Sequence, residues 1–237
     1  MSGHSKWSKI KRDKGANDAK RGAVFTRIGN QIAIAARSGI DPDMNPSLAM
    51  AIEKARQANM PKDNIQRSID RVADKSAAAL EEITYEAMGP GGVGIIIETA
   101  TDNRNRTLPE VKTALVKNGG RIADAGSVMF QFSRKGVIRV AAGGEDALMM
   151  MLEAGAEDAV EEGDETIVYT DQKDLMKVRS ALIEAGLKVE DAELQYIPNA
   201  SVTIDDNETA DKVMRVLDVL DEVGDVVNVH TNADILV

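Results

Sequence analysis

The clearest chemical potential in this sequence lies in the cations near its start. Eight Lys and Arg side chains fall within residues 6–27, and Trp7 lies among them. The cations are Lys6, Lys9, Lys11, Arg12, Lys14, Lys20, Arg21 and Arg27. Cations neutralise phosphates and a tryptophan stacks on an exposed base, so this spacing favours nucleic-acid binding. A solvated terminus that aids solubility is the alternative.

A second group of cations follows on a pair of expected helices, residues 46–58 and 61–73. The pair carries Lys54, Arg56, Lys62, Arg67 and Arg71. A recognition helix reads bases through long polar side chains, and Lys62 and Arg67 are of that kind, as are Asn64 and Gln66. Two short helices joined by a turn also form ordinary cores, and both interpretations stay open.

Two further arginines, Arg104 and Arg106, lie between an expected strand and an expected helix. In an exposed loop before a helix they are placed to hold a phosphate or an RNA edge. The alternative is a structural loop in which Thr107 caps the helix and the arginines pair with local acids.

Catalytic and metal-binding patterns are weak by comparison. The chain has no cysteine, and its two histidines, His4 and His230, belong to no recognisable triad. The acidic run of residues 157–165 does not match EF-hand spacing, and Gly89-Pro90-Gly91-Gly92 lacks the ending of a P-loop. We therefore expect no enzyme activity, no cofactor, no metal and no small-molecule substrate. We expect the acidic run to form the solvated face of a hairpin, and the glycine-rich segment at 89–92 to form a turn.

The charge balance separates the chain into two parts. Residues 1–71 carry a net charge of +7, and residues 72–237 carry a net charge of −17. A basic end on an acidic protein indicates a polyanion partner. No apolar run approaches the roughly 20 residues needed to span a bilayer, so we expect a cytoplasmic protein without a membrane partner. The sequence does not settle the oligomeric state, and a monomer is the default expectation.

The elements that position these residues follow from the apolar spacing. Helical periodicity and caps predict three helices between residues 17 and 75, with the basic tail before them. We expect residues 1–80 to form a basic tail and a helical nucleic-acid-binding domain.

After residue 81 the pattern changes to alternating strands and helices. Residues 137–197 are expected in the order β-α-β-β-α-β, which is typical of a ferredoxin-like domain. The flanking segments, a β-α-β run over 93–132 and a strand, helix and strand over 201–231, give the same order when joined. We therefore expect an α+β protein with two ferredoxin-like α/β domains. Residues 133–198 form an acidic domain inserted into a discontinuous one, 81–132 plus 199–237.

Several segments resemble the YebC family, in order and over nearly the whole chain. They include GHSKW (3–7), NMPKDNI (59–65), TDNRNRT (101–107) and VVNVHTNAD (226–234). The resemblance implies a cytoplasmic protein with a helical N-terminal domain and two α/β domains. It also implies a DNA-binding transcriptional regulator, since bacterial members are usually assigned so. Mitochondrial members act as translational activators, and some bacterial relatives look like ribosome-associated factors.

Two functions are therefore expected from the sequence. The first is a DNA-binding transcriptional regulator that contacts nucleic acid through the basic N-terminal module. The alternative is a translation factor that binds ribosomal RNA or the ribosome and activates translation or relieves stalling. A cationic arm with a tryptophan suits single-stranded or structured RNA better than major-groove reading.

Overall fold

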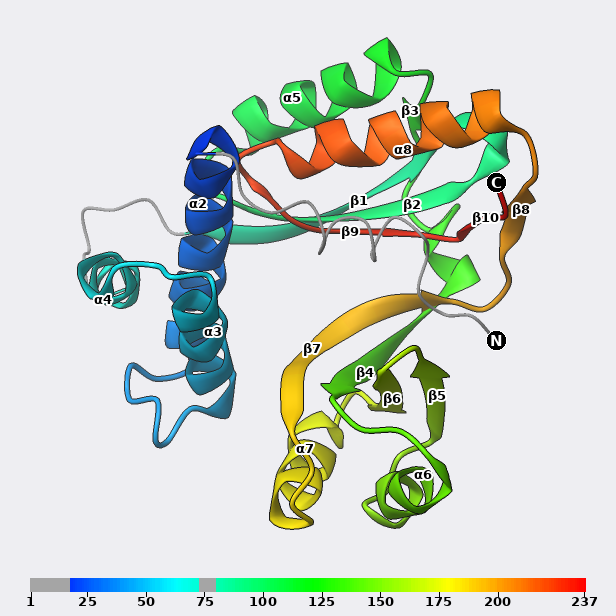
Figure 1. Cartoon of the computed structure of the whole chain (residues 1–237). Helices are drawn as coiled ribbons and strands as arrows, with labels where there is room; N and C mark the ends of the chain where they lie inside the picture. The colour runs from blue at the N-terminus through cyan, green and yellow to red at the C-terminus, as the bar shows by residue number, and fades with distance from the viewer. Residues whose placement is uncertain (1–17, 73–79) are drawn as a thin grey trace. The chain divides into compact units, whose positions relative to one another are not determined.

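The computed structural model of the chain describes residues 18–72 and 80–237, with side chains from Gly22 onward in the first helix. Residues 132–199 form one compact unit, and the described residues before and after them form a second (Figure 1). The expected α+β class is confirmed, since helices come first and α/β parts follow. The boundaries expected for three domains stay a prediction.

The N-terminal part of the second unit consists of three helices. They are α2 (Asp18–Ala36), α3 (Pro46–Gln57) and α4 (Lys62–Asp70). Their apolar faces meet in one aliphatic core that includes Ile32, Leu48 and Ile65. This spacing of apolar residues is the reason that the sequence predicts helices here.

Asn45 fixes the turn between α2 and α3. Its Nδ2 donates to the carbonyl oxygens of Ala35 and Gly39, both at 2.7 Å, and its Oδ1 accepts the backbone N–H of Leu48 at 3.2 Å. The turn between α3 and α4 places Asn59 at φ 58°, in the left-handed region that asparagine tolerates. Both helix junctions are therefore set by an asparagine.

An antiparallel sheet in the order β3-β1-β2-β9 forms the α/β part of the same unit. Its strands are β1 (Glu81–Met88), β2 (Gly94–Thr101), β3 (Arg121–Ile122) and β9 (Val226–Thr231). Two helices, α5 (Arg104–Lys117) and α8 (Asn207–Asp221), lie side by side over one face (Figure 1). Ile95 and Ile97 of β2 and Leu217 of α8 lie in the core between these layers.

The strand expected at 128–132 is wrong. Residues Met129–Gln131 form a 3₁₀ turn, η2, because the Glu86 carboxylate accepts the N–H groups of Gly126, Val128 and Met129 at 2.5–2.7 Å. These N–H groups are therefore not available for the backbone hydrogen bonds of a β-sheet. Burial alone would raise the pKa of Glu86, but the three backbone donors hold it below its ordinary value.

The strand expected at 201–205 exists as β8 (Val202–Ile204), but it lies outside the main sheet. It pairs in parallel with β10 (Ala233–Ile235), a strand that the sequence pattern does not predict. The partners of β2 in the main sheet are β1 and β9. A second short 3₁₀ turn, η1 (Pro90–Gly92), joins β1 to β2, as the glycines predict.

The other unit has the expected ferredoxin-like order. Its elements are β4 (Phe132–Val140), α6 (Glu145–Glu153), β5 (Asp158–Glu162), β6 (Glu165–Asp171), α7 (Leu175–Glu184) and β7 (Val189–Pro198). The sheet runs in the order β5-β6-β4-β7, and all neighbouring strands are antiparallel. The first strand of the unit in the chain, β4, is central and pairs with the last, β7, which lies at one edge, as the ferredoxin-like order requires. The acidic run lies on the β5–β6 hairpin.

Candidate nucleic-acid interface

Most of the predicted nucleic-acid-binding residues lie at the N-terminus. Lys6, Trp7, Lys9, Lys11, Arg12 and Lys14 fall outside the described residues. Lys20 and Arg21 lie in the first turn of α2, but their side chains are not described. The role expected for these eight residues stays a prediction.

Arg27, further along α2, has partners inside the protein. Its guanidinium lies 2.9 Å from the Asp221 carboxylate and donates to the carbonyl oxygens of Asp221 and Val226. Only 11% of the Arg27 side chain is exposed. This geometry gives Arg27 a structural role, which is to hold α2 against the ends of α8 and β9.

Three other polar contacts join the helices to the α/β part. Asn30 donates to the Ala100 carbonyl at 3.3 Å, Arg37 donates to the Leu80 carbonyl, and Arg71 lies 3.0 Å from the Asp102 carboxylate. Together with Arg27 we call these contacts the docking interface. Because they are polar and come from both ends of the helical part, they fix its orientation on the sheet.

Arg106 belongs to a network at the end of the same sheet. The cap in the alternative interpretation is wrong: Asn103, and not Thr107, caps α5, so that both arginines lie in its first turn. Arg106 contacts Asp225 at 2.7 Å and Asp102 at 3.1 Å, while the Thr107 hydroxyl donates to Asp225 at 2.6 Å. Burial alone would raise the pKa of Asp225, but hydrogen bonds from Thr107, Arg106 and Thr101 hold it below its ordinary value.

Three of the predicted cations remain available for a ligand. Arg104 is 68% exposed and lies 3.9 Å from Glu81, which is a weak surface contact. Lys62 and Arg67 are exposed on α4, and within the described ranges their side chains have no hydrogen-bond or ion-pair partner. The structure therefore separates Arg104, Lys62 and Arg67 from the internally paired Arg27 and Arg106.

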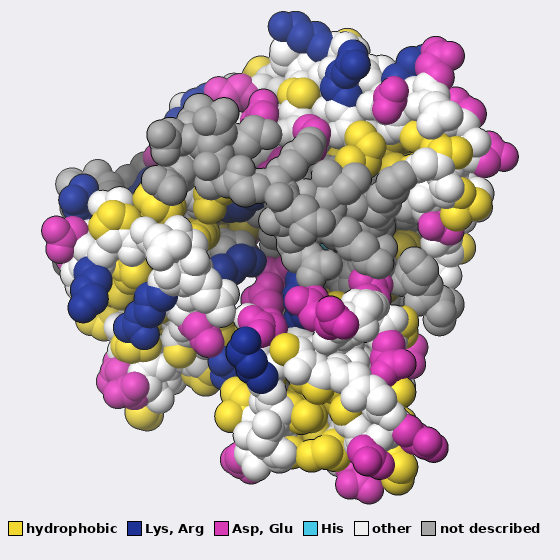
Figure 2. Space-filling model, viewed as in Figure 1, with side chains coloured by type: hydrophobic (Ala, Val, Ile, Leu, Met, Phe, Trp, Pro, Cys, Tyr) yellow, Lys and Arg dark blue, Asp and Glu magenta, His cyan; other side chains and the backbone are white. Residues whose placement is uncertain are grey.

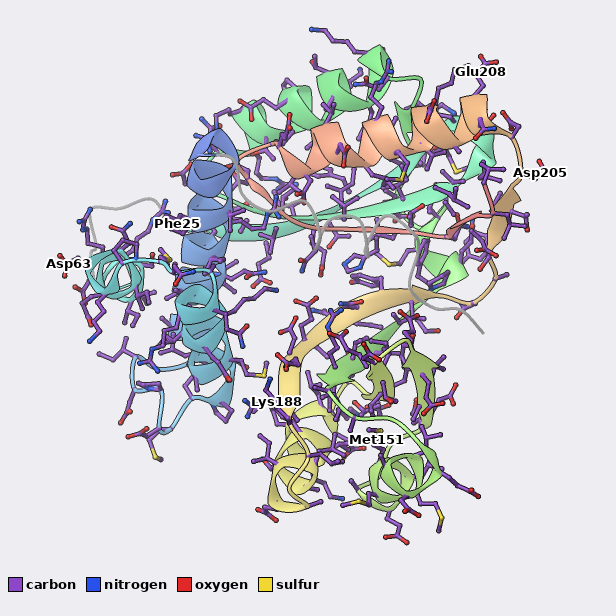
Figure 3. All side chains as sticks on the ribbon, in the orientation of Figure 1. Phe25, Asp63, Met151, Lys188, Asp205 and Glu208 are labelled. Carbon is purple, nitrogen blue, oxygen red and sulfur yellow. The ribbon has the colours of Figure 1, made fainter. Side chains whose placement is uncertain are left out.

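The outer surface of the helices is close to electrical neutrality. Residues 22–72 contain seven Lys and Arg against five Asp and Glu. Asp63 projects from α4 on the side away from α2 (Figure 3), and Asp70 is exposed on the same helix. Acidic side chains lie among the basic ones in the view of Figure 2. Most of the basic charge thus belongs to residues 1–21, which carry a net charge of +5.

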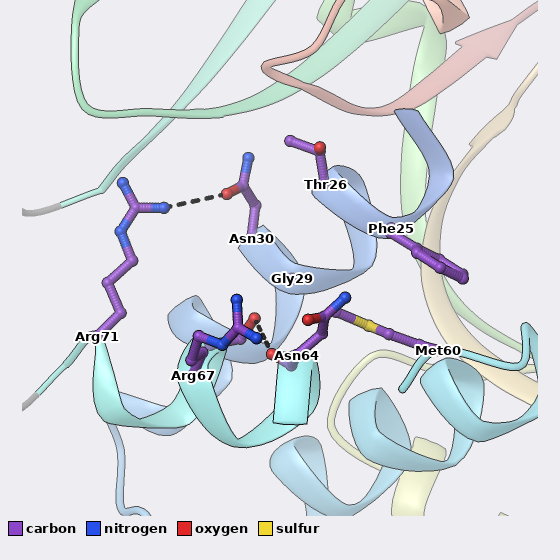
Figure 4. A pocket seen from close by; sticks show the side chains of 9 residues that line it. Phe25, Thr26, Gly29, Asn30, Met60, Asn64, Arg67 and Arg71 are labelled. Carbon is purple, nitrogen blue, oxygen red and sulfur yellow. Dashed lines mark hydrogen bonds between the residues drawn. The ribbon is translucent and has the colours of Figure 1, made fainter. Parts of the chain in front are cut away.

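A groove of about 330 Å³ lies between α2 and α4. Phe25 and Met60 line one end, and Asn30 and Arg71 line the other (Figure 4). Asn64 and Arg67 project from α4 between these ends. The two helices approach closely because residue 29 is glycine, whose added Cβ would lie 2.9 Å from the Ser68 Oγ.

Sequence reasoning missed several of these residues. Nothing in the local pattern shows that Asp225 binds Arg106, which is 119 residues away, or that Phe25 shares a groove with Asn64. His230, expected to stand apart from any motif, lies 2.9 Å from Glu98 on neighbouring strands. The one useful signal was the TDNRNRT segment, in which Asp102 precedes Arg106 by four residues, a spacing that favours an ion pair on a helix.

Three N-terminal helices followed by two α/β parts make up the described part of the chain. Residues 5–75 match the family described as the TACO1/YebC protein N-terminal domain, and residues 80–233 match the TACO1/YebC second and third domain. This chain belongs to the TACO1/YebC family. The resemblance noted in the sequence is confirmed.

Several relatives carry a name that agrees with this assignment. A protein of Rubrobacter xylanophilus and one of Moorella thermoacetica are both 48% identical to this chain, over 99% of it and 96% of each of them. Both are named "Probable transcriptional regulatory protein". A crystal structure of a conserved hypothetical protein from Aquifex aeolicus is also similar, with a TM-score of 0.85, 38% identity and 92% of each chain covered. In the parts of the chain that the structure describes, no helix is long and apolar enough to cross a membrane.

Proposed function

We propose that this chain is a DNA-binding transcriptional regulator that contacts nucleic acid through its basic N-terminal segment, residues 1–21. The observation that carries this proposal is the position of the charge. Residues 1–21 have a net charge of +5, whereas residues 72–237 have a net charge of −17. Phosphates attract the first part and are repelled by the second, so binding is confined to one end of the molecule.

The names of the relatives support a regulatory role on DNA. We propose in addition that the chain is cytoplasmic and has no catalytic activity, and that the acidic unit, residues 132–199, keeps nucleic acid away from its own surface. Lys62, Arg67 and Arg104 are the described cations that would extend the contact beyond the N-terminal segment. Arg27 and Arg106 would contribute through the stability of the fold.

One observation favours RNA as the alternative target. A helix that reads the major groove needs an outer face free of repulsion from the DNA backbone, and the outer face of α4 carries Asp63 and Asp70. Asn64, one of the side chains expected to read bases, lies in the groove towards α2. This arrangement suits an unpaired base better than a duplex, as in a translation factor that binds ribosomal RNA.

Cross-linking in cells, followed by sequencing of both the bound DNA and the bound RNA, separates the two targets. Enrichment of promoter DNA supports the transcriptional regulator. Enrichment of ribosomal RNA, with cosedimentation of the protein with ribosomes, replaces it by the translation factor. Recovery of neither nucleic acid contradicts both.

A further inference from the structure

We infer that the groove between α2 and α4 binds one unpaired nucleotide of a single-stranded RNA. The inference rests on the proposed function only in requiring that the chain binds nucleic acid. It assigns a specific contact at the groove, in addition to the general electrostatic attraction between cations and phosphates. The groove is formed entirely within one unit, by Phe25, Met60, Asn64, Arg67, Arg71 and their neighbours.

Two polar side chains in the groove lack partners within the described residues. They are the Asn64 carboxamide and the Arg67 guanidinium. The neighbouring polar groups are already engaged: Ser68 Oγ donates to the Asn64 carbonyl at 3.0 Å, and Arg71 contacts Asn30 at 3.4 Å and Asp102 at 3.0 Å. A ligand that enters the groove therefore meets one free amide and one free guanidinium.

These two groups, together with Phe25, match the parts of a nucleotide. A base stacks on an aromatic ring and presents hydrogen-bonding edges that a carboxamide recognises. A guanidinium binds a phosphate through two N–H groups. Phe25 and Arg67 line the same groove in Figure 4, with Asn64 beside Arg67. In this inference the ring of Phe25 stacks on the base, the carboxamide of Asn64 binds the edge of the base, and the guanidinium of Arg67 binds the phosphate.

The size of the groove decides between an unpaired and a paired base. Its volume of about 330 Å³ is at the lower end of small-molecule sites, which are roughly 300–1,000 Å³. A stacked base pair cannot enter such a space, whereas the bases of RNA loops and single strands are splayed out and available. The ligand is therefore an unpaired nucleotide, and RNA loops and single strands are its source in this inference.

The test compares binding by the full chain of two fluorescein-labelled probes, a 12-nucleotide unstructured RNA and a 12-base-pair duplex of DNA. The groove variant carries Asn64→Ala and Arg67→Gln. Arg56→Gln is the matched control, because Arg56 is an exposed arginine of α3 that does not line the groove. Circular dichroism and thermal unfolding establish that each variant is folded.

The groove variant is expected to bind the RNA about tenfold more weakly, since one lost stacked or hydrogen-bonded nucleotide corresponds to roughly that factor. Its affinity for the duplex changes less than about twofold, and Arg56→Gln affects both probes equally and slightly. An equal loss in the two variants, or an equal loss on the two probes, overturns the inference. A single-stranded DNA of the same sequence that shows the same tenfold dependence overturns the assignment to RNA.

Cross-linking gives a measurement that does not depend on the stability of a variant. An RNA containing 4-thiouridine, irradiated with the wild-type protein, is expected to modify the tryptic peptides 22–27 and 63–67. Adducts confined to other peptides overturn the inference. If the wild type binds no probe at all, the proposed function fails with it. If binding depends on the N-terminal cations but not on the groove, only the present inference fails.

Discussion

Arg27 of α2 lies 2.9 Å from Asp221 at the end of α8, although 194 residues separate them in the chain. The two side chains are 11% and 22% exposed, so water screens the pair only partly. The contact joins the basic helical part to the acidic α/β part. A cation that the sequence assigns to nucleic acid is thus used to hold the protein together.

The first prediction concerns this pair. Arg27→Gln removes the guanidinium that pairs with the Asp221 carboxylate, and we expect the free energy of unfolding to fall by about 2 kcal/mol. Urea denaturation of the full chain measures the change. The exposed Arg56→Gln serves as control and is expected to change it by less than about 0.5 kcal/mol. Equal effects of the two substitutions would show that Arg27 is not part of the docking interface.

A second prediction concerns the stability of the protein at low pH. The pKa of Asp225 is lowered in the folded protein, so its contribution to stability is present above the unfolded pKa of about 3.9 and is lost as the pH falls through the folded pKa. We expect Asp225→Asn to lower stability at pH 7 and to flatten the decline of stability at acid pH. The exposed Asp211 of α8 provides the control, Asp211→Asn, which should keep the wild-type profile. If the stability of Asp225→Asn depended on pH as that of the wild type does, the hydrogen-bond network around Asp225 would not stabilise the protein as described.

A third prediction distinguishes two glycines of the same helix. Among the described residues, nothing lies within 4 Å of a Cβ added at Gly22, whereas one added at Gly29 lies 2.9 Å from Ser68 Oγ. Gly22→Ala is expected to stabilise the protein by about 0.5–1 kcal/mol, because alanine favours helices. Gly29→Val is expected to destabilise it by about 1–3 kcal/mol, because α4 must move away.

Thermal unfolding of both variants checks this prediction. The cost of Gly29→Ala should also decrease in a Ser68→Ala background, because the closest atom is then absent. If Gly29→Val is as stable as Gly22→Ala, the helices do not approach as closely as described. The groove would then be wider than we infer.

The two arginines of α5 provide a fourth prediction. Arg106 is held by Asp225 and Asp102, and Arg104 is 68% exposed. We expect Arg106→Gln to lower the free energy of unfolding by about 1–2 kcal/mol. Arg104→Gln should leave stability unchanged and weaken nucleic-acid binding about twofold, as the loss of one phosphate contact would. Urea denaturation measures the stability, and fluorescence anisotropy measures the binding. A loss of stability in Arg104→Gln, with weaker binding only in Arg106→Gln, would contradict these roles.

The sequence predicts the elements that depend on local periodicity. The helices of the N-terminal part follow from apolar residues such as Ile28, Ile32 and Ile69, which recur at helical spacing. The order of the ferredoxin-like unit follows from alternating strands and the glycines between them. Both are local patterns, and both are confirmed by the structure.

The predictions that failed depended on distant residues. Residues 128–132 have a mostly apolar sequence typical of a strand, but the carboxylate of Glu86 accepts the backbone N–H groups of Val128 and Met129 from about 40 residues away. In the alternative interpretation of the loop at Arg104 and Arg106, Thr107 caps the helix, but its hydroxyl binds Asp225. The groove, too, requires the packing of α2 against α4, which no local pattern specifies. Tertiary contacts thus decided these three features.

The proposed binding of nucleic acid depends most directly on the N-terminal cations, and the salt dependence of the affinity tests their role. If six to eight cations contact phosphates, the logarithm of the affinity for duplex DNA should fall against the logarithm of salt concentration with a slope of roughly −5 to −7. Replacing Lys9, Lys11, Arg12 and Lys14 with Glu should make this slope shallower by about 3 to 4 and leave thermal unfolding unchanged. A wild-type slope near zero, or an equal slope in the variant, would contradict the claim that the N-terminal segment binds nucleic acid.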